Sequence, residues 1–123
     1  MAEARSEAAS ALRLDPQIAA AHFTIGFVLE HSGQPTEGMA EYETVLRMKP
    51  DYAEAYLRLG VILSRQGRYR EAVDHYAEFL RLAPGSAEVE NNMGVLLGRL
   101  GDIQGAVAHY REALRFRDRK SVV

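Results

Sequence analysis

The feature that most constrains this 123-residue sequence is an internal repeat of fixed period. Prolines, two series of glycines and one series of tyrosines all recur at the same interval: Pro16, Pro50 and Pro84; Gly26, Gly60 and Gly94; Gly33, Gly67 and Gly101; Tyr42, Tyr76 and Tyr110. Residues 53–86 and 87–120 are identical at 14 of 34 positions, including the block Ala-Val-x-His-Tyr. A fixed period of about 34 residues is typical of repeat architectures, in which each period is one supersecondary unit.

The first half of a period has the pattern of a helix. Residues 53–67 carry apolar residues at the spacing of one helical face, at Tyr56, Leu59 and Leu63. Gly60 lies inside this helix, where glycine costs up to about 1 kcal/mol relative to alanine. Its recurrence in three periods indicates a partner helix that approaches too closely for a side chain. Gly67 is expected to end the helix in the left-handed conformation.

The second half of a period has the pattern of another helix, over residues 68–82. Pro84 is expected to stop this helix, because proline cannot continue the hydrogen-bond ladder. Neither helix of such a hairpin can bury its apolar face alone, so successive hairpins are expected to stack on one another. No stretch of the sequence is typical of a strand. The sequence therefore predicts an all-α solenoid in a single domain over residues 1–120, followed by a tail at residues 121–123.

Composition excludes several classes of function. The chain has no cysteine, which excludes disulfides, thiolate metal sites and cysteine nucleophiles. Fifteen basic and 17 acidic residues give a net charge of −2, so we expect no general affinity for nucleic acid. No stretch is apolar and long enough to insert into a membrane, and the N-terminus lacks the apolar segment of a signal peptide. We therefore predict a cytoplasmic protein, and its arginine-rich balance suggests a bacterial source.

Motifs for catalysis or for a bound cofactor are not apparent in the sequence. The four histidines have no partners at zinc-site spacing, and we expect them to be structural or surface residues: His22, His31, His75 and His109. The sequence motifs of zinc proteases, phosphate-binding loops, serine hydrolases and dinucleotide-binding folds do not occur. We predict no catalytic, cofactor-binding or metal-binding residue, and no enzyme activity.

The period and its residue types resemble the tetratricopeptide repeat. Three full repeats match the pattern of large and small residues in that family, at residues 19–52, 53–86 and 87–120. Residues 1–18 match only the second helix of a repeat. The resemblance implies a right-handed superhelix of antiparallel helical hairpins and a non-catalytic role in binding other proteins.

Three residues depart from the family pattern. His22 and Glu90 stand where a large aromatic residue is usual, so we expect looser helix packing at both places. Asp118 replaces the proline that closes the other repeats, so the last helix is expected to run on or to fray.

The first helix of each repeat lines a concave groove in this family, and the resemblance assigns ten residues here to such a groove: Phe23, Phe27, Leu57, Arg58, Val61, Arg65, Asn91, Asn92, Val95 and Arg99. These would supply apolar anchors together with arginines, whose planar forks suit a carboxylate. We predict a scaffold that binds a peptide segment of a protein partner, whose identity the sequence does not reveal. The alternative that these arginines are solvated and pair with nearby carboxylates stays open.

The resemblance does not extend to the members that bind Hsp70 and Hsp90. Those hold a carboxyl terminus with two lysines, two asparagines and an arginine at five groove positions. The equivalent residues here are Phe23, Phe27, Arg58, Glu88 and Asn92, and none of them matches. We therefore expect a partner of another kind.

Two alternatives to peptide binding remain open. One is self-association into a homodimer or larger oligomer, because residues 1–18 lack a first helix and residues 103–120 lack the polar cap that terminal repeats need. The other is an accessory domain of a larger bacterial enzyme, whose catalytic residues would lie outside this sequence.

Overall fold

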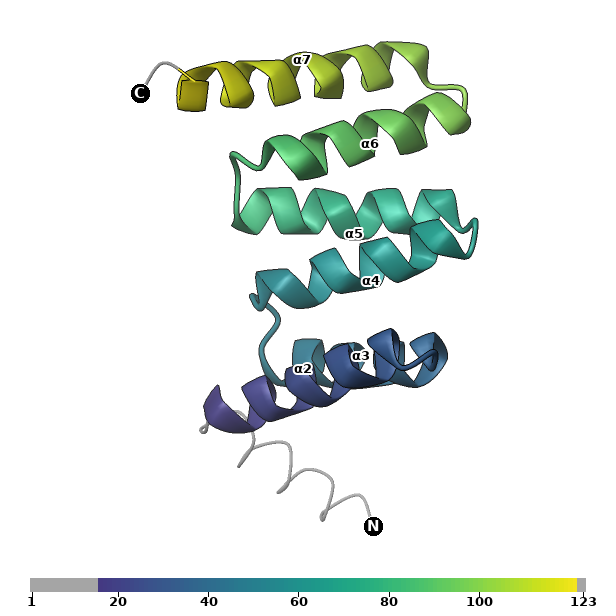
Figure 1. Cartoon of the computed structure of the whole chain (residues 1–123), viewed down its shortest axis with the longest axis vertical. Coiled ribbons are helices and arrows are strands. Elements are labelled where there is room, and N and C mark those ends of the chain that lie inside the picture. Colours follow the sequence, from purple (N-terminus) through teal and green to yellow (C-terminus); the bar gives the residue numbers. More distant parts are fainter. Residues whose placement is uncertain (1–15, 122–123) are drawn as a thin grey trace. The chain divides into compact units, whose positions relative to one another are not determined.

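The computed structural model describes the backbone of residues 16–121 and the side chains of residues 17–117. Within that range it holds helices and no strand (Figure 1). The helices are α2 (Pro16–His31), α3 (Pro35–Met48), α4 (Ala53–Arg65), α5 (Tyr69–Leu82), α6 (Ala87–Arg99) and α7 (Ile103–Ser121). The predicted all-α class is confirmed. Most of the predicted half repeat, at residues 1–15, lies outside the described range.

The helices fall into two compact units, of which the first ends at Ala55 and the second begins at Tyr56. In the first unit α2 packs against α3. In the second unit α6 packs against both α5 and α7, and Figure 1 shows these three helices side by side. Most of α4 also belongs to the second unit, where Tyr76 of α5 lies against Gly60 of α4.

The turn inside each repeat has the same hydrogen bond. A backbone N–H shortly after the helix donates to the carbonyl of a leucine five positions earlier, at 2.9 Å in all three repeats: Gln34 to Leu29, Arg68 to Leu63 and Asp102 to Leu97. The glycine between them is left-handed each time, with φ of +78° at Gly67. This geometry closes a helix with its last carbonyls satisfied, and only glycine adopts it without steric cost. The predicted role of Gly67 is confirmed.

Gly60 confirms the predicted close approach of two helices. A Cβ atom at this position would lie 3.0 Å from the ring of Tyr76, closer than ordinary van der Waals contact. The other repeats place Tyr42 over Gly26 and Tyr110 over Gly94 in the same way. Each tyrosine therefore fits against a helix that has no side chain at the point of contact.

The ends of the second helices follow the prolines. Helices α3 and α5 each stop two positions before a proline, at Met48 and Leu82, and each has 14 residues. Helix α7 has Asp118 in place of the proline and continues to Ser121, over 19 residues. The expectation that the last helix runs on is confirmed.

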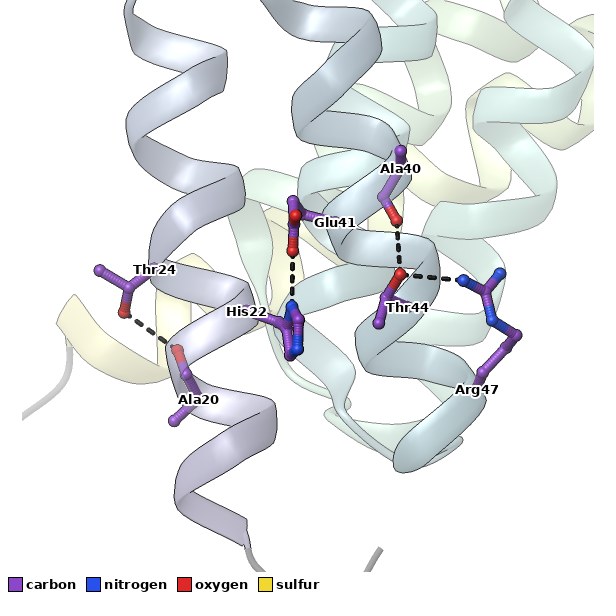
Figure 2. Close-up of polar contacts among 7 residues, drawn as sticks. All are labelled: Ala20, His22, Thr24, Ala40, Glu41, Thr44 and Arg47. Carbon is purple, nitrogen blue, oxygen red and sulfur yellow. Dashed lines mark hydrogen bonds and ion pairs between the residues drawn. The ribbon is translucent and has the colours of Figure 1, made fainter. Parts of the chain in front are cut away.

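A polar pair joins the two helices of the first repeat. Nδ1 of His22 on α2 lies 2.7 Å from Oε2 of Glu41 on α3, and Figure 2 shows the two side chains facing each other between the helices. The last repeat has the same contact with the residue types exchanged, because Oε2 of Glu90 on α6 lies 2.6 Å from Nδ1 of His109 on α7. Each residue that replaces the usual aromatic is thus held by a partner on the second helix of its own repeat.

Candidate functional site

A hollow of about 350 Å³ lies in the second unit, between residues of α4 and α6 and beside α5. Its lining residues are Arg58, Val61, Ser64, Arg65, Tyr76, Glu88, Asn92, Val95 and Leu96. Cationic, hydroxyl, amide and apolar groups therefore share one concave surface.

Helical periodicity explains why these side chains meet. On α4, residues 58, 61 and 65 follow one another at intervals of three and four, which places them on one face of the helix. On α6, residues 88, 92 and 95 are spaced at four and three. The two faces line the same hollow, and Tyr76 reaches it from α5, where its ring packs against Gly60.

The Tyr76 hydroxyl shows how the charges act on this hollow. Burial raises the pKa of Tyr76 above that of an ordinary tyrosine, while the positive charges of Arg58 and Arg65 act in the opposite direction. Glu88 adds to the effect of burial, and a hydrogen bond from the Asn92 side chain opposes it. Two cations and an amide therefore act to stabilise negative charge at this position, and one carboxylate acts against it.

The hollow also has an apolar side. Val61, Val95 and Leu96 line it, and Val95 is 39% exposed although its side chain is purely hydrocarbon. A surface that combines exposed valines with arginines suits a ligand that has an apolar body and an acidic group.

The structure brings together five of the ten residues that the sequence assigned to a groove: Arg58, Val61, Arg65, Asn92 and Val95. Arg99 is directed elsewhere, because its guanidinium lies 5.4 Å from the ring centre of Tyr69 and donates to the Tyr69 hydroxyl at 3.3 Å. Asn91 lines a second hollow, between α6 and α7. Leu57 is half-buried and does not line either hollow.

The remaining two residues, Phe23 and Phe27, lie on α2 in the first unit. Phe23 is half-buried, with its ring centre 5.3 Å from that of Tyr42 and 5.3 Å from that of Tyr52. Phe27 is 43% exposed, and its ring centre lies 4.1 Å from that of His31. Phe23 therefore belongs largely to the packing of its own unit, whereas Phe27 presents an aromatic surface.

Four further residues line the hollow, namely Ser64, Tyr76, Glu88 and Leu96, and sequence reasoning missed Tyr76 and Leu96 altogether. Ser64 and Glu88 stand at groove positions in the family pattern, although they are not among the ten residues assigned to binding. Tyr76 lies on the second helix of its repeat, whereas the family pattern assigns only first-helix residues to the groove. It nevertheless lines the hollow, which a periodicity argument does not show.

The described residues also bear on metal binding and on membrane insertion. Among them, no group of three or more histidine, aspartate or glutamate side chains is placed to hold a metal ion. No helix in the described part of the chain combines the length and the apolar character needed to cross a membrane.

Comparisons with known proteins extend this description. A family model described as "Tetratricopeptide repeat" matches residues 17–85 and, overlapping them, residues 53–119. No curated protein matches the sequence. Among solved structures, "Crystal structure of MamA" has a TM-score of 0.81 and 20% identity over 85% of this chain and 61% of that one. The "CopN-Scc3 complex" has a TM-score of 0.78 and 11% identity over 83% of this chain and 60% of that one. The chain spans about three-fifths of the length of each, and at these identities the likeness shows the fold.

Proposed function

This chain belongs to the tetratricopeptide repeat family, and on that premise we propose that the hollow between α4 and α6 binds an acidic segment of a partner protein. Repeats of this family typically act as protein-interaction scaffolds with no catalysis of their own. The observation that carries the proposal is the placement of Arg58 and Arg65 beside Tyr76 in one hollow. The role proposed is therefore binding, with the carboxylate of an aspartate, a glutamate or a chain terminus as the anchoring group.

The donors around the hollow support a carboxylate as the ligand. Arg58 and Arg65 offer planar guanidinium groups, which bind a carboxylate through two parallel hydrogen bonds. Asn92 offers an amide N–H on the opposite helix. A carboxylate is an acceptor only, so this set of donors matches it better than it matches a cationic or neutral group.

Glu88 and the valines narrow the kind of segment further. Glu88 places a negative charge at the α6 side of the hollow, which disfavours a dense run of acidic residues there. Val61 and Val95 favour apolar contact beside the acidic group. The segment proposed is one carboxylate flanked by apolar residues, of a size that a hollow of about 350 Å³ accommodates as one or two side chains.

Selection from a random peptide library on the immobilised full chain tests this proposal. We expect peptides with one acidic residue next to apolar residues to be enriched. The double variant Arg58→Glu with Arg65→Glu should weaken binding of an enriched peptide more than about tenfold, measured by fluorescence anisotropy, because it reverses both charges in the hollow.

A matched control makes the same charge change elsewhere. Arg47→Glu with Arg70→Glu alters two exposed arginines that do not line the hollow, and peptide affinity should stay within about twofold of the unaltered chain. Enrichment of basic peptides, or equal losses in the two double variants, would show that this hollow is not the binding site.

A further inference from the structure

The last helix carries an exposed apolar face. Its four residues are spaced at intervals of four, three and four, which places them on one side of α7: Ile103, Val107, Tyr110 and Leu114. Their exposed fractions run from 37% at Tyr110 to 64% at Ile103. A hollow of about 370 Å³ adjoins this face, lined by residues that include Asn91 and Leu114. A contiguous apolar face of this kind marks an interaction surface.

The same positions one repeat earlier show which helix packs against such a face. The equivalents on α5 are Tyr69, Val73, Tyr76 and Leu80, and none of them is exposed. Helix α6 packs against α5, and its Asn92 hydrogen-bonds the Tyr76 hydroxyl. The α7 face therefore occupies the positions that, on α5, are covered by the first helix of the following repeat.

Helix α6 covers α5 with an identifiable set of side chains. Glu90 and Gly94 contact α7, as the Glu90–His109 bond and the Tyr110 ring against Gly94 show. The buried residues Val89, Met93 and Leu96 lie on an adjoining side, since one position along a helix turns the side chain by about 100°. They are therefore on the side that faces α5, and Leu96 lines the same hollow as Tyr76.

Helix α2 presents the same three positions without a cover in the described structure. The equivalents of Val89, Met93 and Leu96 are Ala21, Ile25 and Val28, each two repeats earlier in the sequence. All three are exposed, Ile25 to 48% and Val28 to 57%. The residues with which a first helix covers its predecessor are thus exposed on α2, and no described helix packs on them.

We infer that the α7 face binds α2 of a second copy of this chain, in the way that α5 receives α6. In this contact, α2 of one copy packs against α7 of the other. The residues of α2 are Ala21, Ile25 and Val28, and those of α7 are Ile103, Val107, Tyr110 and Leu114. Thr24 stands on α2 where Asn92 stands on α6, so a hydroxyl group takes the place of the amide beside the tyrosine. This contact is independent of the proposed binding of an acidic segment.

The two faces differ, so the contact is heterologous: each copy offers one α2 face and one α7 face. Such contacts repeat from copy to copy, and they close into a ring or continue as a filament. A chain that has lost one face can still bind through the other. That property separates this arrangement from a symmetric dimer in which two α7 faces meet.

Molar mass by light scattering, over a range of concentrations, tests the inference with two double variants of the full chain. Ile25→Glu with Val28→Glu removes the α2 face, and Val107→Glu with Leu114→Glu removes the α7 face. The unaltered chain should exceed the monomer mass of 13.7 kDa as concentration rises, and each variant alone should stay at that mass. A 1:1 mixture of the two should form a species of twice that mass, because one intact face of each kind remains.

Controls keep the result interpretable. Ala40→Glu with Ala77→Glu adds the same charge at exposed positions outside both faces and should assemble like the unaltered chain. Circular dichroism checks that each variant is helical, and serine at the same four positions replaces glutamate wherever a glutamate variant does not fold.

Three results would overturn the inference. The first is a monomer at every concentration. The second is a mixture that stays monomeric while the unaltered chain assembles. The third is normal assembly by the α2 variant, which points to a symmetric α7 contact or, if deleting residues 1–14 then abolishes assembly, to that segment as the occupant.

Discussion

Helices α5 and α7 hold equivalent positions in consecutive repeats and share the block Ala-Val-x-His-Tyr, yet they differ in what covers them. Tyr76 on α5 is 3% exposed, whereas Tyr110 on α7 is 37% exposed. Both rings lie against a glycine of the preceding helix. The difference therefore comes from the following helix, which α5 has in α6 and which α7 does not have among the described residues. In a repeat protein, the burial of a residue depends on the neighbouring repeat as much as on its own sequence.

The largest effect should come from truncating the two tyrosines. Tyr76→Ala leaves a cavity between α4, α5 and α6 and should lower the free energy of unfolding by about 3–5 kcal/mol. Tyr110→Ala removes a ring that is already partly hydrated and should cost about 1–2 kcal/mol. Urea unfolding followed by circular dichroism measures both. Equal losses would show that α6 adds no protection to Tyr76.

The next largest difference in the free energy of unfolding should lie between the two histidine–glutamate pairs. Glu90 is buried, so Glu90→Ala removes a covered hydrogen bond and should cost about 1–3 kcal/mol. Glu41 and His22 are about 30% exposed, so Glu41→Ala should cost under about 1 kcal/mol.

An exchange variant checks that the Glu90 effect comes from the pair. Glu90→His with His109→Glu reproduces the order of residues in the first repeat, and its unfolding free energy should recover most of the loss. If the exchange variant is no more stable than Glu90→Ala, the contact with His109 is not the source of the loss.

The glycines beneath the two tyrosines give a smaller contrast. A methyl group at Gly60 would meet a ring held under α6, so Gly60→Ala should destabilise the chain by about 1 kcal/mol, net of the helix propensity gained. At Gly94 the added methyl group would meet the Tyr110 ring, which has solvent to move into, so the net change should be near zero. Thermal unfolding of the two variants, side by side, measures the difference. A greater loss for Gly94→Ala would contradict this account.

Substitutions at the starts of α7 and α5 should have the smallest effects on stability. At α7, Oδ1 of Asp102 accepts the backbone N–H of Gly105 at 2.9 Å, so Asp102→Ala should cost about 1 kcal/mol, as the loss of a helix cap does. At α5 the equivalent residue, Arg68, instead forms an exposed ion pair with Glu71. Arg68→Ala should leave stability unchanged within error.

The Arg68 substitution should still be visible in a titration. Hydrogen bonds from Arg68 lower the pKa of Glu71 below its usual value. A group with a lowered pKa stabilises the folded state above the unfolded pKa and loses that contribution as pH falls through the folded pKa. In Arg68→Ala the pKa of Glu71 should rise towards its usual value, as measured by NMR. An unchanged pKa would mean that the ion pair does not form in solution.

Much of the fold could be predicted because single residue types mark it. The turn at Gly67 and the close approach at Gly60 follow from what glycine alone allows, and the length of α7 follows from Asp118 in place of proline. These are local properties of the chain, and the internal period repeats them.

The side-chain partners could not be predicted in the same way. His109 and Glu90 lie on different helices, and comparing repeats position by position does not reveal a pair that joins two positions. Arg99 and Arg65 stand at the same repeat position and were both assigned to the groove, but Arg99 contacts Tyr69. The residue equivalent to Tyr69 one repeat earlier is Pro35, which has no aromatic ring. For the hollow, the sequence predicted which face of α4 and α6 takes part, and the packing decides which side chains enter it.

The reversed order of the two histidine–glutamate pairs has a consequence for the pairing of helices during folding. A hairpin assembled from α2 and α7 would set His22 beside His109, and one assembled from α6 and α3 would set Glu90 beside Glu41. Repeats this alike in their apolar residues are prone to join the wrong helices during folding. The polarity of the pair penalises such chimeric hairpins, since neither mismatched contact can bring a carboxylate to an imidazole. The exchange of residue types therefore disfavours hairpins that combine a helix of the first repeat with a helix of the last repeat.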